Sequence, residues 1–193
     1  MTERRTHKPT LVITEHDHAE GDVAAPVTLV EYGDFQCPYS RAAIKTIQAL
    51  QREFGQDLRF VFRHFPLADK HPHAVQAAEA AEAAAAQGRF WPMYATLFAN
   101  QWELEYADLM DYARQLELDR GKFGEALTTH RHLDHIRGDV ATGREQGVGG
   151  TPTFFVNGRR QDGDDDVRAL AAAIRHALAT GTLSLRRMLV PIA

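Results

Sequence analysis

The chain has 193 residues, of which 44% are hydrophobic and 25% are charged, and its net charge at neutral pH is −4. This size predicts one substantial domain, and the negative balance argues against a general nucleic-acid binder, which usually carries a basic patch. No apolar run approaches the ~20 residues that span a bilayer, and the first residues lack the apolar stretch of about 7–15 residues of a secretory signal, so we expect a cytoplasmic protein without membrane contact.

The first 25 residues are polar and are interpreted as an arm with one short strand at Thr10 to Ile13. His16 and His18 amount to half of a metal site, and a solvated arm explains them better because the nearby sequence offers no further ligands. A turn over Asp22 to Pro26 is expected to lead into the first core strand.

A strand, a helix and a second strand follow this arm. Val27 to Tyr32 is rich in β-forming residues, Arg41 to Phe54 repeats apolar residues every three or four positions, and Leu58 to Phe62 alternates. Gly55 supplies the helix stop. A crossover of this length predicts a right-handed βαβ unit with two parallel strands.

The next segment, from about His73 to His135, has no good strand pattern and is expected to be a helical insertion. A break is expected near Leu118-Asp119. The helical patterns cover Ala74 to Ala86, Trp91 to Ala99, Leu104 to Leu116 and Lys122 to Gln146. Three histidines (His130, His132 and His135) fall in the last pattern, but they do not make a closed ligand set with standard spacing, so we expect no metal site.

Strand character returns at Thr153 to Val156, where Asn157-Gly158 is a strong hairpin signal. Arg159 to Gln161 should therefore begin an antiparallel partner strand. Asp162 to Asp166 lacks the glycine and the glutamate of a calcium loop, and it is better explained as the start of a helix over Val167 to Ala179.

The only cysteine, Cys37, lies between the first strand and its helix, within Phe35-Gln36-Cys37-Pro38-Tyr39-Ser40. The field of a helix N-terminus favours the thiolate, which is the nucleophilic form of the side chain. A free cysteine is most often a small core residue, but Gly33-Asp34 and Pro38 mark a turn, so we favour a reactive thiol. One cysteine cannot form an internal disulfide.

Far along the chain, Thr151-Pro152 opens the returning strand. If this peptide bond is cis, the turn exposes backbone groups that can pair with an extended peptide or with glutathione. The spacing alone does not distinguish this turn from an ordinary glycine–proline loop.

Four blocks of the sequence, Val27 to Tyr39, Arg63 to Leu67, Gln87 to Trp91 and Gly150 to Gly158, together resemble the DsbA-like branch of the thioredoxin superfamily over about residues 26–179. The resemblance implies an α/β fold, namely a thioredoxin fold with an inserted helical domain. Together with the polar first residues, this divides the chain into an N-terminal arm (1–25), the first part of the thioredoxin fold (26–66), the helical insertion (67–146), the second part of the fold (147–180) and a C-terminal tail (181–193). Whether the tail packs on the domain or on a partner chain is left open.

The same resemblance implies roles for individual residues. Cys37 would be the nucleophile and Pro152 the cis-proline beside it. Thr151 would contact the substrate backbone, and Glu31 matches the buried acidic proton relay of the family. Pro38 and Tyr39 are expected to contribute to substrate binding.

Ser40 departs from the family pattern, because it stands where the family has the second cysteine of Cys-x-x-Cys. The chain therefore cannot store a disulfide by itself. Cys37 can still form a mixed disulfide, which an external thiol would resolve. Ser40, one helical turn on, is expected to donate a hydrogen bond to the thiolate, and Glu31 would lose part of its relay role.

Three functions remain open at this point. The first is a single-cysteine thiol-disulfide oxidoreductase acting on protein or glutathione disulfides, with no tightly bound cofactor and glutathione as a co-substrate. The second is a glutathione-dependent transferase or isomerase. The third is a non-catalytic module that holds a peptide at the Pro152 turn. The sequence does not give the substrate, the direction of redox transfer or the oligomeric state.

Overall fold

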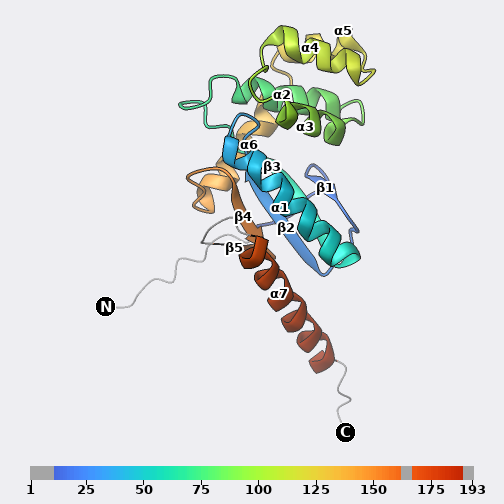
Figure 1. The fold of residues 1–193 in the computed structure, drawn as a ribbon, viewed down its shortest axis with the longest axis vertical. Helices are drawn as coiled ribbons and strands as arrows, with labels where there is room; N and C mark the ends of the chain where they lie inside the picture. Colours follow the sequence, from blue (N-terminus) through green and yellow to red (C-terminus); the bar gives the residue numbers. More distant parts are fainter. Residues whose placement is uncertain (1–10, 162–166, 189–193) are drawn as a thin grey trace, which may run out of the picture.

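The computed structural model describes residues 11–161 and 167–188 (Figure 1). Five strands and seven helices occur in these residues, together with a short 3-10 turn at Gly55–Asp57 that follows the first helix. The strands are β1 (His18–Glu20), β2 (Val27–Gly33), β3 (Leu58–His64), β4 (Thr153–Val156) and β5 (Arg159–Arg160). The helices are α1 (Pro38–Phe54), α2 (Ala74–Ala85), α3 (Phe90–Ala99), α4 (Tyr106–Gln115), α5 (Arg120–Thr128), α6 (Leu133–Glu145) and α7 (Val167–Met188).

The strands form one mixed sheet in the order β1-β3-β2-β4-β5. β2 and β3 are parallel over their full length, from Val27 opposite Leu58 to Gly33 opposite His64. All other neighbours are antiparallel. The predicted βαβ unit is confirmed, and so is the hairpin at Asn157-Gly158, where both residues adopt positive φ as a two-residue hairpin turn requires.

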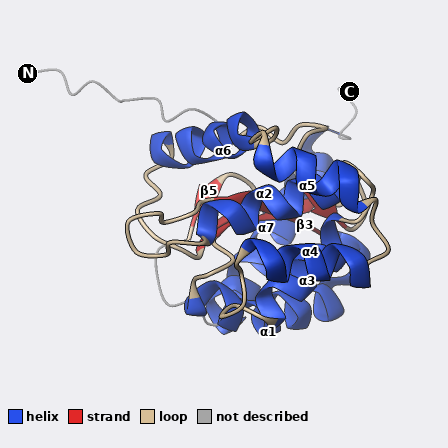
Figure 2. Ribbon diagram, turned by 90° about the horizontal axis from the view of Figure 1, so that it is seen from above, coloured by secondary structure: helices blue, strands red, loops and turns tan. Residues whose placement is uncertain are grey.

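The two faces of the sheet are covered by different helices, because successive side chains of a strand point to opposite faces. Leu29 and Phe60 point to the face where α1 and α7 pack. Val30 and Val61 point to the other face, where they meet Val140 of α6 and the segment that begins at residue 11. The sheet therefore lies between two layers, and the insertion of α2 to α5 extends beyond one end of it (Figures 1 and 2).

The insertion is built around α2, which contacts α3, α4, α5 and α6. Alanine predominates in this helix and is buried on most sides. Alanine has the highest helix propensity, and its small side chain allows the surrounding helices to pack closely. Glu79 and Glu82 are the two charged residues that this helix buries.

The N-terminal segment differs from its prediction. Residues 11–13 of the expected strand Thr10 to Ile13 form no strand, and the strand of this region is β1 instead. The segment is not a solvated arm either, since Asp17 forms an ion pair with Arg63 of β3 and His18 is largely buried. The prediction was wrong because the partners of these polar side chains lie far along the chain.

The helix expected over Lys122 to Gln146 is also two helices, α5 and α6. They are separated at His130, which adopts a positive φ of 51°. A residue in this left-handed conformation cannot continue a helix, and neither glycine nor proline marks the position. By contrast, the break predicted near Leu118-Asp119 is confirmed, and Asp119 caps α5 by accepting a hydrogen bond from the Lys122 amide.

The final helix, α7, is longer than predicted. It runs through Gly181 to Met188, so the first part of the expected tail is helical. The aspartate run Asp162 to Asp166 lies outside the described residues.

Candidate functional site

Cys37 caps the N-terminus of α1. Its backbone is extended, its carbonyl accepts the first helical hydrogen bond from Arg41 N at 3.1 Å, and Pro38 occupies the first turn. Proline suits this position because its fixed φ matches the helix and the missing N–H has no helical acceptor. Cys37 is only 3% exposed. The thiol thus lies at the N-terminal, positive end of the α1 dipole.

Asp34 fixes the turn that leads into Cys37. It is buried, and its carboxylate accepts hydrogen bonds from Gln36 N at 2.8 Å and from Leu67 N at 2.8 Å. The Nδ1 atom of His71 lies 2.7 Å from the same carboxylate. Because an ionised carboxylate only accepts hydrogen bonds, His71 must donate here. Asp34 therefore connects residues 34–37, called the cysteine turn below, to the loop that follows β3.

Gln101 holds the same turn from the helical insertion. Its side-chain amide is buried and donates to the carbonyl oxygens of Phe35 at 2.7 Å and of Cys37 at 2.9 Å. Sequence reasoning missed this residue, since an isolated glutamine after a helix carries no recognisable signal. The turn is consequently braced both by the sheet region and by the insertion.

The Thr151–Pro152 turn lies beside the thiol. The peptide bond is cis, and the Cys37 Sγ donates to the Thr151 carbonyl oxygen at 3.2 Å across 114 positions of sequence. The hydroxyl oxygen of Thr151 is buried and has no hydrogen-bond partner among the described residues. The cis peptide bond, stated conditionally on the sequence alone, is therefore present, and the two motifs meet.

Ser40 and Glu31 are both fully buried. The Ser40 hydroxyl accepts a hydrogen bond from Asp34 N at 3.3 Å; within the described ranges it makes none to Cys37. Glu31 lies in the centre of β2, between Phe62 of β3 and Phe154 of β4. Burial, together with the charge of Glu31, raises the pKa of Tyr94, which stays protonated at neutral pH.

Pro38 and Tyr39 form the exposed rim of the site, and Tyr39 is 71% exposed. Thr151 and Pro152, beside the thiol, are partly exposed. The arrangement offers a cysteine at a helix N-terminus, an adjacent backbone carbonyl and an aromatic side chain for contact. These groups suit attack on a disulfide that is presented in an extended segment.

The family follows from comparison with known proteins. A sequence model described as "Thioredoxin" matches residues 13–176. The chain belongs to the thioredoxin family.

Solved structures place this thioredoxin-family chain near the DsbA-like proteins. BdbD from Bacillus subtilis has a TM-score of 0.77 and 24% identity, covering 83% of this chain and 92% of that one. A thioredoxin-like oxidoreductase from Silicibacter pomeroyi DSS-3 also has a TM-score of 0.77, with 26% identity and coverage of 86% and 94%. The α-DsbA1 of Wolbachia pipientis has a TM-score of 0.74, 19% identity and coverage of 91% and 97%. The fold is thus a DsbA-like thioredoxin fold with a helical insertion.

Sequence relatives are much longer than this thioredoxin-family chain. Na(+)/H(+) antiporter NhaA 1 of Salinispora arenicola is 49% identical over 165 residues, which make up 86% of this chain and 25% of the relative. NhaA 3 of Salinispora tropica is 48% identical over 169 residues, with shares of 88% and 26%. The chain spans about a quarter of the length of these relatives. None of the helices among the described residues is long and apolar enough to cross a membrane.

A second cluster of polar side chains lies on the α6 side of the sheet. Arg63 of β3 donates to both carboxylate oxygens of Asp17, at 2.6 and 3.0 Å, and to the Tyr32 hydroxyl at 3.0 Å. Although burial by itself would raise the pKa of Asp17, the bonds from Arg63 hold this pKa below its usual value. Arg63 and Asp17 thereby fasten the N-terminal segment to the sheet.

Proposed function

We propose that this chain is a thiol-disulfide oxidoreductase that works through Cys37 alone. The observation that carries the proposal is the placement of the thiol at the N-terminus of α1, within hydrogen-bond distance of the Thr151 carbonyl beside a cis proline. The DsbA-like fold supports the general class of reaction.

The proposed reaction has two exchange steps. The Cys37 thiolate attacks one sulfur of a disulfide, the bond between the two substrate sulfurs breaks, and the leaving thiolate takes up a proton. The resulting mixed disulfide is then attacked by the thiolate of an external thiol such as glutathione, which releases Cys37. Each step exchanges one sulfur–sulfur bond for another. The first step releases one of the two substrate sulfurs as a thiol, and the second releases the other in a disulfide with the external thiol.

Binding is proposed to use the Thr151 carbonyl and the exposed rim. An extended peptide or the glutathione backbone would pair with the backbone beside Pro152, as a strand pairs with a sheet edge. Tyr39 would cover part of this segment. Because little of Cys37 is exposed, we expect disulfides in extended, accessible segments to react in preference to those inside folded domains.

A cytoplasmic location, expected from the sequence, would supply the reducing thiol that the second step needs. We therefore propose that the protein acts in the cytoplasm. The antiporter activity named for the long relatives is not transferred to this chain, which corresponds to only a quarter of them.

The test follows the thiol through one cycle. Purified protein is incubated with oxidised glutathione, its intact mass is measured, and reduced glutathione is then added. We expect one glutathione on the wild type, none on Cys37→Ser, and release of the adduct by the added thiol. A wild type that stays unmodified while unfolded protein is modified readily would refute the covalent mechanism and favour the non-catalytic peptide-binding module.

Ser40→Cys tests the importance of the missing second thiol. This buried residue lies one helical turn after Cys37, so the variant regains the Cys-x-x-Cys spacing. We expect its glutathione adduct to resolve without added thiol, leaving an internal disulfide. Ser40→Ala is the matched control and should still need the external thiol.

A further inference from the structure

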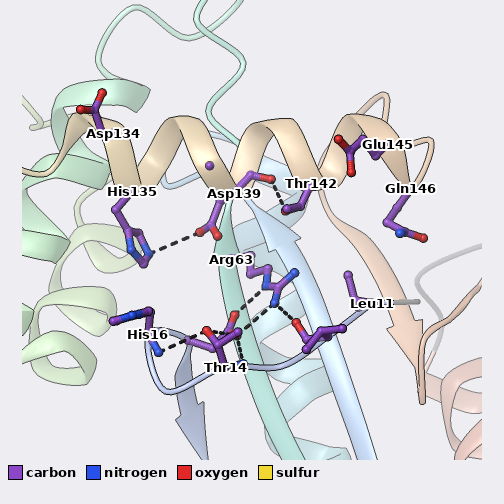
Figure 3. A pocket seen from close by; sticks show the side chains of 13 residues that line it. Leu11, Thr14, His16, Arg63, Asp134, His135, Asp139, Thr142, Glu145 and Gln146 are labelled. Atoms are coloured by element: carbon purple, nitrogen blue, oxygen red, sulfur yellow. Dashed lines mark hydrogen bonds and ion pairs between the residues drawn. The ribbon is translucent and has the colours of Figure 1, made fainter. Parts of the chain in front are cut away.

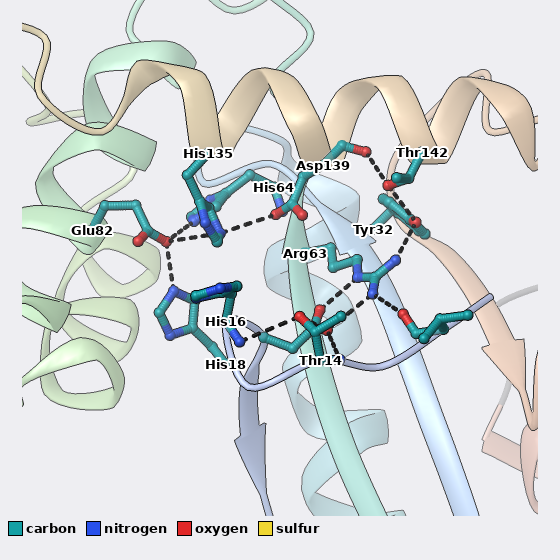
Figure 4. A network of polar contacts seen from close by, with 12 residues as sticks. Thr14, His16, His18, Tyr32, Arg63, His64, Glu82, His135, Asp139 and Thr142 are labelled. Atoms are coloured by element: carbon teal, nitrogen blue, oxygen red, sulfur yellow. Dashed lines mark hydrogen bonds and ion pairs between the residues drawn. The ribbon is translucent and has the colours of Figure 1, made fainter.

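Four side chains from four separate elements converge between the sheet and the helical insertion. They are His18 of β1, His64 at the end of β3, Glu82 of α2 and His135 of α6. Figure 4 shows the three imidazole rings directed toward the Glu82 carboxylate. Elements that are distant in sequence thus supply three nitrogen ligands and one oxygen ligand to one place.

The contacts are made by the same kind of atom in each ring. The Nε2 atoms of His18, His64 and His135 lie 2.5, 2.7 and 3.8 Å from Oε1 of Glu82. Ligand atoms of His18, His64 and Glu82 all lie within 4.8 Å of one another. In a tetrahedral zinc site with bonds of about 2.0–2.1 Å, neighbouring ligand atoms lie about 3.3 Å apart. Two of the three Nε2–Oε1 distances are shorter than this value, and the distance from His135 is longer.

The rings also form a nearly regular triangle. The centroid separations are 6.1 Å for His18 and His64, 6.0 Å for His18 and His135, and 6.2 Å for His64 and His135. The His18 ring is held by stacking on Phe90, with centroids 3.5 Å apart. The three Nε2 atoms all face Oε1 of Glu82, and imidazoles spaced in this way can converge on one ion.

The burial and the negative charge of Glu82 also favour a bound cation. The His64 and Glu82 side chains are 1% and 8% exposed. A buried carboxylate is costly unless its charge is compensated, and histidines supply positive charge only when they are protonated. A divalent cation would neutralise Glu82 while all three rings remain neutral ligands.

We propose that His18, His64, Glu82 and His135 bind a divalent transition metal, with Zn²⁺ as the best match. Imidazole and carboxylate ligands in a four-coordinate arrangement suit zinc, whereas magnesium and calcium prefer oxygen ligands. The sequence argued against a metal because no local spacing closed a ligand set. The fold closes it through Glu82, whose place in an alanine-rich helix carries no ligand signal.

The surroundings provide a supporting residue and a path to solvent. Asp139 lies one turn after His135 on α6, and its carboxylate supports His64 by accepting a hydrogen bond from the His64 backbone amide at 2.9 Å. His135 and Asp139 also line a pocket of about 450 Å³ beneath α6 (Figure 3). The pocket therefore brings solvent to His135, which is the most exposed of the four side chains.

Such a site would join β1, β3, α2 and α6, which means that the metal would fasten the insertion and the N-terminal segment to the sheet. The inference goes beyond the proposed thiol chemistry and does not depend on it. None of the four ligands is Cys37, so the two sites can be tested separately.

The experiment is a Zn²⁺ titration of the untagged full chain after treatment with a chelator, followed by competition with a chromophoric chelator. We expect one Zn²⁺ per chain. His135→Ala, in which the replaced side chain is 30% exposed, should retain its fold by circular dichroism and lose affinity by at least about 100-fold. His18→Ala should lose a similar factor. The absorption of bound Co²⁺ would show whether the site is tetrahedral.

Two control variants separate this site from other binding. His176→Ala changes an exposed histidine on α7 and should leave the affinity unchanged. Cys37→Ser should also bind normally, which excludes the thiol as the ligand. The proposal is overturned if the wild type binds no stoichiometric Zn²⁺, if His135→Ala binds like the wild type, or if Cys37→Ser abolishes binding.

Discussion

Removing the Asp34 carboxylate should destabilise the cysteine turn. In Asp34→Ala, the amides of Gln36 and Leu67 and the ring of His71 lose their common acceptor. All three are donors, and Asp34 itself is buried, so water cannot take its place without opening the turn. Asp34→Asn keeps the shape of the side chain but only one of its two acceptor oxygens. Its NH₂ group would face a hydrogen-bond donor, with which it cannot form a hydrogen bond.

The size of the effect follows from these three bonds. Hydrogen bonds to a charged group contribute about 1.5–3 kcal/mol each. At the lower end, three bonds correspond to a loss of about 4–5 kcal/mol in the free energy of unfolding for Asp34→Ala. Asp34→Asn should lose about 2–3 kcal/mol, since it leaves one or two donors unsatisfied. A domain of ordinary stability, roughly 5–15 kcal/mol, would keep its fold in most cases but with a marginal reserve.

Urea unfolding followed by circular dichroism measures these losses. Asp69→Ala is the matched control because Asp69 is exposed in the same loop as His71, and its change should stay within about 0.5 kcal/mol. We also expect Cys37 of Asp34→Ala to react faster with a bulky alkylating reagent. A loss below about 1 kcal/mol for Asp34→Ala would show that the three bonds do not hold the turn.

Four further results are expected. Asp17→Ala should cost about 3–5 kcal/mol in urea unfolding, because it leaves the Arg63 guanidinium buried without its anion. The stability that this pair contributes is fully present at pH values above the usual pKa of a carboxyl group, and it is lost as the pH falls through the lowered pKa of Asp17. In Asp17→Asn the free energy of unfolding should therefore change less with pH on the acid side. In α6, Gly143→Ala places a Cβ 2.9 Å from an aromatic ring, whereas Gly138→Ala meets nothing within 4 Å; the first variant should be less stable than the second by about 1–3 kcal/mol, and equal stabilities would contradict the packing. Gln101→Ala should lose about 1–3 kcal/mol through its two donor bonds to the cysteine turn, with Asn100→Ala as the neighbouring control. Zn²⁺ at 100 times its dissociation constant should stabilise the chain by about 2.7 kcal/mol, and a chelator should remove this gain.

The sequence was sufficient for the frame of the fold. The β2–α1–β3 unit and the β4–β5 hairpin have strong local signals, namely apolar periodicity, glycine stops and the Asn157-Gly158 pair. The cysteine turn and Thr151-Pro152 were also recognised, the latter through the resemblance. Each of these signals lies within one strand, helix or turn of consecutive residues.

The supports of the site could not be predicted in the same way. Gln101 at the cysteine turn and Glu82 at the proposed metal site contact partners 64 residues away, and neither has a local pattern that distinguishes it from a surface residue. The break between α5 and α6 was missed for a related reason, since His130 adopts its left-handed backbone without a glycine. Contacts of this kind depend on how the elements are packed, which no window of sequence contains.

The two edges of the sheet have a consequence for solubility. The outermost strands are short, with three residues in β1 and two in β5, and the exposed pair Arg159–Arg160 forms the whole of β5. β1 covers the edge of β3, and β5 covers the edge of β4; both inner strands are longer and largely apolar. Short, charged edge strands discourage a second chain from adding its own strand. The chain should therefore resist edge-to-edge aggregation even at high local concentration, for instance where many copies are held side by side on one surface.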